Sequence, residues 1–76
     1  MPDTGNRVRA LRTARNLTQA ELSESLGVSR QTINAIETGK FDPSLPLALK
    51  LSAFFALPTD ALFWLTDLSP DPPPPD

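Results

Sequence analysis

A very short connection between two helical segments is the feature that most limits how this chain can fold. Thr18-Gln-Ala-Glu21 has the spacing of a capping box, in which a threonine hydroxyl and a glutamate carboxylate each accept a hydrogen bond from a free backbone N–H, so we expect a helix to begin there. Gly27 suits the left-handed turn just past a helix end. Ser29 can then cap a second helix, which Gly39 ends. Helices joined only by Leu26-Gly27-Val28-Ser29 are too closely linked to pack antiparallel and must cross steeply.

The residues around this crossing match what a helix-turn-helix unit requires. Ser23 offers a small side chain where the first helix faces the second, and Val28 is apolar at the turn. Ile33 and Ile36 supply an inner face for the second helix. Each feature is common by itself, but together they favour a helix-turn-helix.

The rest of the chain from Asn6 to Leu65 predicts further helices separated by short turns, because no stretch alternates with the period of 2 that is typical of strands. We expect helix over residues 6–15, over 45–56 with Ser44 as its cap, and over a short segment that begins near Thr59 or Asp60. Five short helices with short connections predict a compact all-α domain.

We expect one domain over residues 6–68, with an N-terminal arm at 1–5 and a proline-rich tail at 69–76. The tail holds five of the nine prolines, and proline has no backbone N–H, so an extended polyproline-type or disordered conformation is predicted. Its composition is compatible with a PxxP-type ligand segment and with a solubilising extension.

Composition excludes several classes of function. The chain has no Cys and no His, which removes thiol chemistry, thiolate metal sites and the commonest general base. No convergent acid, base and nucleophile set and no Gly-rich phosphate loop is recognisable, so we predict that the protein is not an enzyme and needs no metal or cofactor. No apolar run is long enough for a membrane span and the N-terminus lacks a signal-peptide core, which predicts a cytoplasmic protein.

The charges are unevenly distributed along the chain, although the formal net charge is only -2. Residues 6–40 carry six Lys or Arg against three Glu, whereas residues 41–76 carry one Lys against five Asp. This asymmetry fits a positive face on an acidic protein, and it fits scattered solvated charges equally well. Candidate phosphate neighbours are Arg7, Arg9, Arg15 and Lys40, each of which could equally be a solvated charge.

The helix that follows Ser29 has two unlike faces. Ile33, Ile36 and Glu37 look inward, and the outward face carries Arg30, Gln31, Asn34 and Thr38. Arg can pair with guanine O6 and N7, and Gln or Asn can pair with adenine N6 and N7, in the major groove of DNA. An ordinary solvated face would more typically carry Glu and Lys, so the pattern favours contacts to base edges.

Arg12 and Glu37 both fall on inward faces, beside Leu11 and Ile36 respectively. We therefore predict an ion pair between the first and third helices, which would orient the helix with the base-contacting face. Two unrelated surface charges are the alternative.

The segment expected to be helical over 45–56 is apolar almost all round, with only Lys50 and Ser52 interrupting it, and such a helix must be covered on every side. We predict a homodimer whose interface includes Phe54, Phe55, Phe63, Trp64 and Leu65. A well-filled monomeric core is the alternative. So is an antitoxin or adaptor module that binds a different protein through this surface.

Four segments resemble the Xre family, the helix-turn-helix regulators related to phage Cro and CI repressors, and in particular its short single-domain members. They are Arg7-Val-Arg-Ala-Leu-Arg12, Leu17-Thr-Gln-Ala-Glu-Leu22, Gly27-Val-Ser-Arg-Gln-Thr-Ile-Asn-Ala-Ile-Glu-Thr-Gly-Lys40 and Asp42-Pro-Ser-Leu45. The resemblance covers roughly residues 6–65. It implies a lambda-repressor-like domain of five helices that binds a pseudo-palindromic operator in double-stranded DNA as a homodimer, most simply as a repressor.

The resemblance also implies roles for individual residues. Base contacts fall to Arg30, Gln31 and Asn34, and the ion pair Arg12–Glu37 is structural. The expected contacts to the DNA backbone are Thr18, Gln19, Ser29, Thr32, Lys40 and Arg9, with Gln19 also bracing a base contact. The chain departs from the family pattern at Ser23, where Ala is usual, and after Lys40, where Phe41 and Asp42 are not basic.

Overall fold

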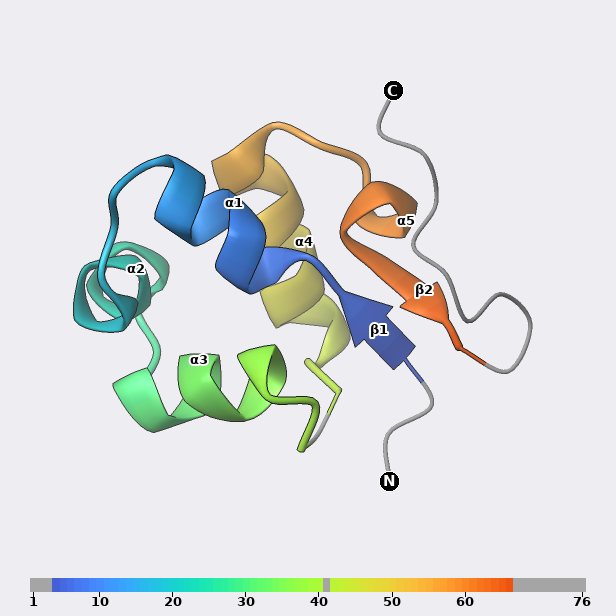
Figure 1. Cartoon of the computed structure of the whole chain (residues 1–76), viewed down its shortest axis with the longest axis horizontal. Coiled ribbons are helices and arrows are strands. Elements are labelled where there is room, and N and C mark those ends of the chain that lie inside the picture. The colour runs from blue at the N-terminus through green and yellow to red at the C-terminus, as the bar shows by residue number, and fades with distance from the viewer. Residues whose placement is uncertain (1–3, 41, 67–76) are drawn as a thin grey trace.

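The computed structural model describes residues 4–40 and 42–66, and these residues form five helices and a pair of short strands (Figure 1). The elements in chain order are β1 (Thr4–Asn6), α1 (Val8–Ala14), α2 (Gln19–Leu26), α3 (Arg30–Glu37), α4 (Leu45–Phe55), α5 (Thr59–Leu62) and β2 (Phe63–Leu65). The prediction of five helices is confirmed.

The capping signals form as the sequence predicts. Thr18 Oγ1 accepts a hydrogen bond from the Glu21 backbone N–H at 3.0 Å, and Glu21 Oε1 accepts one from the Thr18 N–H at 2.8 Å. Gly27 ends α2 in the left-handed conformation with φ 73°. Ser29 Oγ accepts from the Thr32 N–H at 3.1 Å, so α3 begins where the serine cap places it.

Both ends of the domain differ from the predicted helices. Asn6 lies in β1 and not in a helix, and its Oδ1 accepts from the Val8 N–H at 3.0 Å, so α1 starts two residues later. Trp64 and its neighbours form β2, which pairs antiparallel with β1 in the register Thr4↔Leu65, Gly5↔Trp64, Asn6↔Phe63. The expectation of helix without strands was wrong here because three-residue strands are too short to show a period of 2.

Thr4 and Gly5, which we assigned to an N-terminal arm, therefore lie in the strand pair. Gly5 allows the two strands to approach, since a Cβ atom there would lie 2.5 Å from Trp64 Nε1. The predicted proline-rich tail at 69–76 lies outside the described residues.

One core joins all five helices. Each helix contributes a side chain with no exposed surface: Val8, Leu22, Ile33, Leu51 and Leu62. α3 packs on this core through Ile33 and Ile36 and lies at the outside of the molecule, at the lower left of Figure 1, so its other face is left uncovered.

Candidate nucleic-acid interface

The steep crossing of α2 and α3 depends on a small side chain and a tight turn. Ser23 is 6% exposed and its Oγ donates to the Ala20 carbonyl at 2.8 Å, so the hydroxyl is satisfied within its own helix. The Val28 N–H donates to the Ser23 carbonyl at 3.0 Å and closes the turn. The crossing fixes how α3 projects from the domain.

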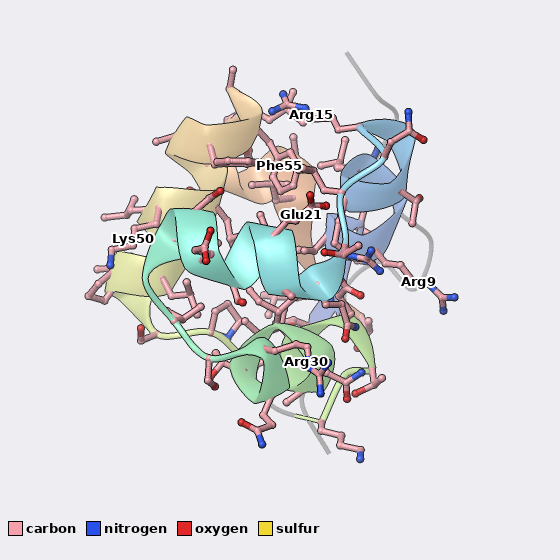
Figure 2. All side chains as sticks on the ribbon, turned by 90° about the vertical axis from the view of Figure 1, so that its left-hand side faces the viewer. Arg9, Arg15, Glu21, Arg30, Lys50 and Phe55 are labelled. Carbon is pink, nitrogen blue, oxygen red and sulfur yellow. The ribbon has the colours of Figure 1, made fainter. Side chains whose placement is uncertain are left out.

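α3 presents a polar face that nothing in the described part of the chain covers. Arg30, Gln31 and Asn34 are all exposed, whereas Ile33 and Ile36 on the opposite side are buried. Figure 2 shows the Arg30 side chain lying across the front of α3, on the side that faces the viewer. The three exposed side chains line one shallow hollow together with Gln19 and Lys40.

A buried ion pair holds α3 against α1. Arg12 Nε lies 2.7 Å from Glu37 Oε2 and Arg12 Nη2 lies 3.1 Å from Glu37 Oε1, so the contact is bidentate. The two side chains are only 11% and 2% exposed. The hydrogen bond to Glu37 raises the pKa of Arg12, against the opposing effect of burial.

The same ion pair also fixes the start of α2. Arg12 Nη1 donates to the Leu17 carbonyl at 2.7 Å, and Gln19 Nε2 donates to Glu37 Oε1 at 3.0 Å. Gln19 is therefore attached to the end of α3 by its amide nitrogen. This places Gln19 beside the exposed face of α3.

The other residues expected at the DNA backbone lie around this face, but they differ in exposure and in whether their side chains already make hydrogen bonds. Arg9 is exposed and lines a second hollow with Asn34 and Thr38, and Lys40 is also exposed. Thr18 and Ser29 are exposed at the first turns of α2 and α3, but their hydroxyls already serve as helix caps. Thr32 is half-buried, with its Oγ1 2.8 Å from Ser29 Oγ.

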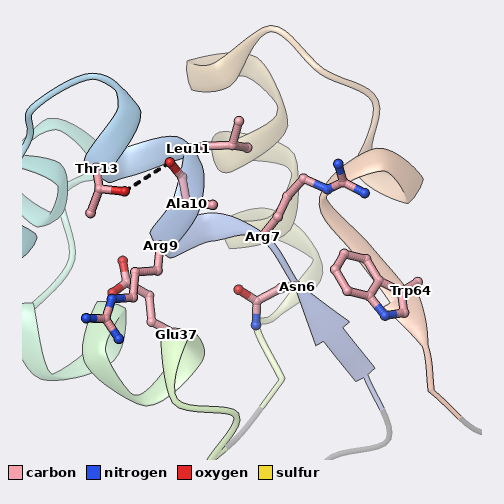
Figure 3. A pocket seen from close by; sticks show the side chains of 8 residues that line it. All are labelled: Asn6, Arg7, Arg9, Ala10, Leu11, Thr13, Glu37 and Trp64. Atoms are coloured by element: carbon pink, nitrogen blue, oxygen red, sulfur yellow. Dashed lines mark hydrogen bonds between the residues drawn. The ribbon is translucent and has the colours of Figure 1, made fainter. Parts of the chain in front are cut away.

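Two of the candidate phosphate neighbours are engaged elsewhere. The Arg7 guanidinium lies 5.4 Å from the Trp64 ring centroid, on the side of a hollow opposite Arg9 (Figure 3). Arg15 donates to the carbonyls of Phe54 and Phe55, at 3.1 and 3.4 Å, at the end of α4. These contacts join residues far apart in the sequence, and sequence patterns could not separate Arg7 and Arg15 from Arg9.

The residues predicted for a dimer interface are not equally available. Phe55 is 3% exposed and belongs to the core, so it has no surface left for a partner. Phe54 and Phe63 pack partly against the core, and Trp64 is half-buried.

The large apolar side chains that are most exposed are Leu45 at 69%, Leu49 at 53% and Leu65 at 49%. The i, i+4 spacing of Leu45 and Leu49 on one helix is the signal by which the sequence could have pointed to this exposed pair.

Residues 4–40 and 42–66 contain no group of three or more His, Cys, Asp or Glu side chains that could hold a metal ion. Among the helices of the same ranges, none has the length and apolar character needed to cross a membrane.

Comparison with known proteins agrees with the geometry. A helix-turn-helix family profile matches residues 8–62. Uncharacterized HTH-type transcriptional regulators of Methanocaldococcus jannaschii and Bacillus subtilis (YgzD) are 50% and 44% identical, each over 82% of this chain and 94% of the relative. The crystal structure of the restriction-modification controller protein C.AhdI from Aeromonas hydrophila superposes with a TM-score of 0.64 at 34% identity, over 70% of this chain and 80% of that one. This chain therefore belongs to the Xre-type, Cro/CI-like family of helix-turn-helix transcriptional regulators, a family that binds DNA and does not catalyse reactions.

Proposed function

We propose that the protein is a sequence-specific repressor that binds a pseudo-palindromic operator as a homodimer, with α3 of each protomer in the major groove. The observation that carries this proposal is the exposed row of Arg30, Gln31 and Asn34 on a helix that a bidentate, buried ion pair holds in place. Side chains that discriminate between bases need such a rigid support, because a small displacement would lose the paired hydrogen bonds.

The surroundings of α3 supply contacts to phosphate. Arg9 and Lys40 are exposed beside the base-contacting side chains. Free N–H groups at the starts of α2 and α3 add partial positive charge, which favours phosphate binding. Such contacts set the position of the protein on the duplex, and α3 selects the sequence.

The homodimer rests on the exposed leucines. Leu45, Leu49 and Leu65 are apolar side chains that the protomer leaves uncovered. A two-fold dimer would present its α3 helices to successive major grooves about 34 Å apart, one helical turn of DNA. Binding across a promoter would then exclude other proteins from it, which is the basis for assigning repression.

Selection of bound sequences from a random duplex pool tests the proposal. We expect a two-fold symmetric consensus. Arg30→Ala should weaken binding by about 1–3 kcal/mol and relax the preference at one base position per half-site. Lys40→Ala, the matched control, should weaken binding to all sequences equally. If Arg30→Ala lowered affinity equally for the consensus and for scrambled duplexes, Arg30 would contact only the backbone.

The exposed leucines also fit a second function, an adaptor that binds a different protein. The purified protein separates the two: a dimer in light scattering favours the homodimeric regulator, and a monomer that selects no duplex favours the adaptor.

A further inference from the structure

Thr38 lies at the end of the outward face of α3, one turn after Asn34. It is exposed, and it lines a hollow together with Arg9, Gln19 and Asn34. Its side chain is held by the helix itself: Thr38 Oγ1 donates to the Asn34 carbonyl at 2.9 Å and lies 3.4 Å from the Ala35 carbonyl.

This internal hydrogen bond decides what Thr38 can offer to DNA. A threonine hydroxyl has a single hydrogen to donate, and here that hydrogen is used inside the helix. Phosphate oxygens at neutral pH only accept hydrogen bonds, so Thr38 cannot donate to one while its internal bond is intact. The hydroxyl oxygen keeps lone pairs that can accept a hydrogen bond from a base amine, and the Cγ2 methyl is the apolar group that remains for contact.

An apolar group on a face that approaches base edges has one natural partner in the major groove, the C5-methyl group of thymine. We propose that the Thr38 methyl group contacts a thymine methyl, which makes Thr38 a specificity-determining residue. The inference rests on the proposed function of α3. Four residues of helix span about 6 Å, and base pairs are stacked about 3.4 Å apart. The thymine should therefore lie within two base pairs of the position that Asn34 contacts.

Replacement of thymine by deoxyuridine tests the contact, because it removes the methyl group and leaves the pairing unchanged. The position that Asn34 contacts is first located as the one whose preference Asn34→Ala relaxes in the selection. Each thymine within two base pairs of it is then replaced in the selected duplex. Removal of one buried methyl group should weaken binding by the wild-type protein about fourfold at one position per half-site.

Two variants of Thr38 assign the effect to its methyl group. Thr38→Ser keeps the hydroxyl and loses the methyl group, so the ratio of thymine to deoxyuridine affinities should fall to about one. Thr38→Val keeps a methyl group and loses the hydroxyl, so the fourfold ratio should remain. Because each ratio is measured within one variant, any loss of folded protein cancels.

The inference is overturned if no thymine occurs within two base pairs of the Asn34 position, if deoxyuridine has no effect there, or if the ratio survives in Thr38→Ser. In each case the wild-type protein still selects a duplex, so the proposed function stands. Failure of the wild-type protein to select any duplex would instead overturn both proposals.

Discussion

Glu37 is a single carboxylate on which three segments depend. It accepts hydrogen bonds from Arg12 of α1 and from Gln19 of α2, and it is itself part of α3. Its side chain is almost fully buried, so removing it would leave the Arg12 guanidinium buried without its counter-charge. A buried pair adds little net stability, but breaking one by removing a single partner is costly.

We expect Glu37→Ala to lower the free energy of unfolding by about 3 kcal/mol. Glu37→Gln should cost less, because the amide oxygen can still accept a hydrogen bond from Arg12. Urea unfolding followed by circular dichroism measures both. Glu24→Ala, at an exposed position of α2, is the control and should change stability by less than about 0.5 kcal/mol. Equal losses for Glu37→Ala and Glu24→Ala would contradict a structural role for the ion pair.

Arg9 and Arg15 show how two arginines near each other in sequence serve different ends. Arg15 binds the last carbonyls of α4 and lies 5.0 Å from the Phe55 ring centroid, whereas Arg9 is exposed beside α3. Arg15→Ala should lower the free energy of unfolding by about 1 kcal/mol, because it removes these hydrogen bonds and the cation–π interaction. It should leave the salt dependence of DNA binding unchanged.

Arg9→Ala should have the opposite profile. Stability should be unchanged, and the slope of log affinity against log salt should become shallower by about 0.9 for each phosphate that Arg9 neutralises in the wild-type complex. Fluorescence anisotropy at several salt concentrations, together with thermal unfolding, measures both variants. A salt slope altered by Arg15→Ala and not by Arg9→Ala would reverse the assignment.

At the scale of elements, prediction from the sequence worked where the signal was local. The capping box at Thr18, Gly27 and the Ser29 cap each act within one turn of a helix, so α2 and α3 begin and end close to where they were expected. The inward placement of Arg12 and Glu37 also followed from helical periodicity alone. The strand pair could not be found this way, because Gly5 and Trp64 are far apart in sequence and only the folded chain brings them together.

The strand pair depends on the missing side chain of Gly5. A Cβ atom there would lie 2.5, 2.7 and 2.9 Å from three atoms of the Trp64 indole. Gly5→Ala should therefore displace the indole and destabilise the protein by about 1–3 kcal/mol. Trp64 is the only tryptophan in the chain, so its fluorescence should shift to longer wavelength as the ring becomes more exposed.

Combining this change with Trp64→Leu separates the clash from other effects of the new methyl group. In the Trp64→Leu background, Gly5→Ala should cost much less than in the wild-type protein, because the indole is no longer there to be displaced. Equal costs in the two backgrounds would show that the indole is not what Gly5 accommodates.

At the scale of the whole molecule, the net charge conceals the arrangement that matters. Arg9, Arg30 and Lys40 gather around α3 on a chain whose formal charge is -2. Arg12 is neutralised by Glu37, and Arg7 and Arg15 face other parts of the domain. Few cations are therefore free to contact phosphate, which favours weak non-specific binding and a strong dependence on base contacts.

The apolar side chains of α4 are also divided, with Leu47, Ala48, Leu51 and Phe55 buried and Leu45 and Leu49 left exposed. In the proposed dimer, in which Leu49 lies in the interface, we expect Leu49→Glu to produce a monomer, since a charge in an apolar interface would lose its hydration without gaining a partner. The fold should survive, because Leu49 is 53% exposed in the protomer. Sedimentation equilibrium and circular dichroism measure the two effects.

The same substitution should weaken DNA binding, because a monomer can engage only one half-site of the operator at a time. A dimer gains affinity by engaging both half-sites at once, so the Leu49→Glu monomer should bind the full operator at least tenfold more weakly than the wild-type protein. Its affinity for a duplex with one half-site should be unchanged. Ser25→Glu, which adds the same charge at an exposed position of α2, should remain dimeric and bind the full operator as before. If the Leu49→Glu protein remained dimeric, the dimer interface would lie elsewhere than at the exposed leucine of α4.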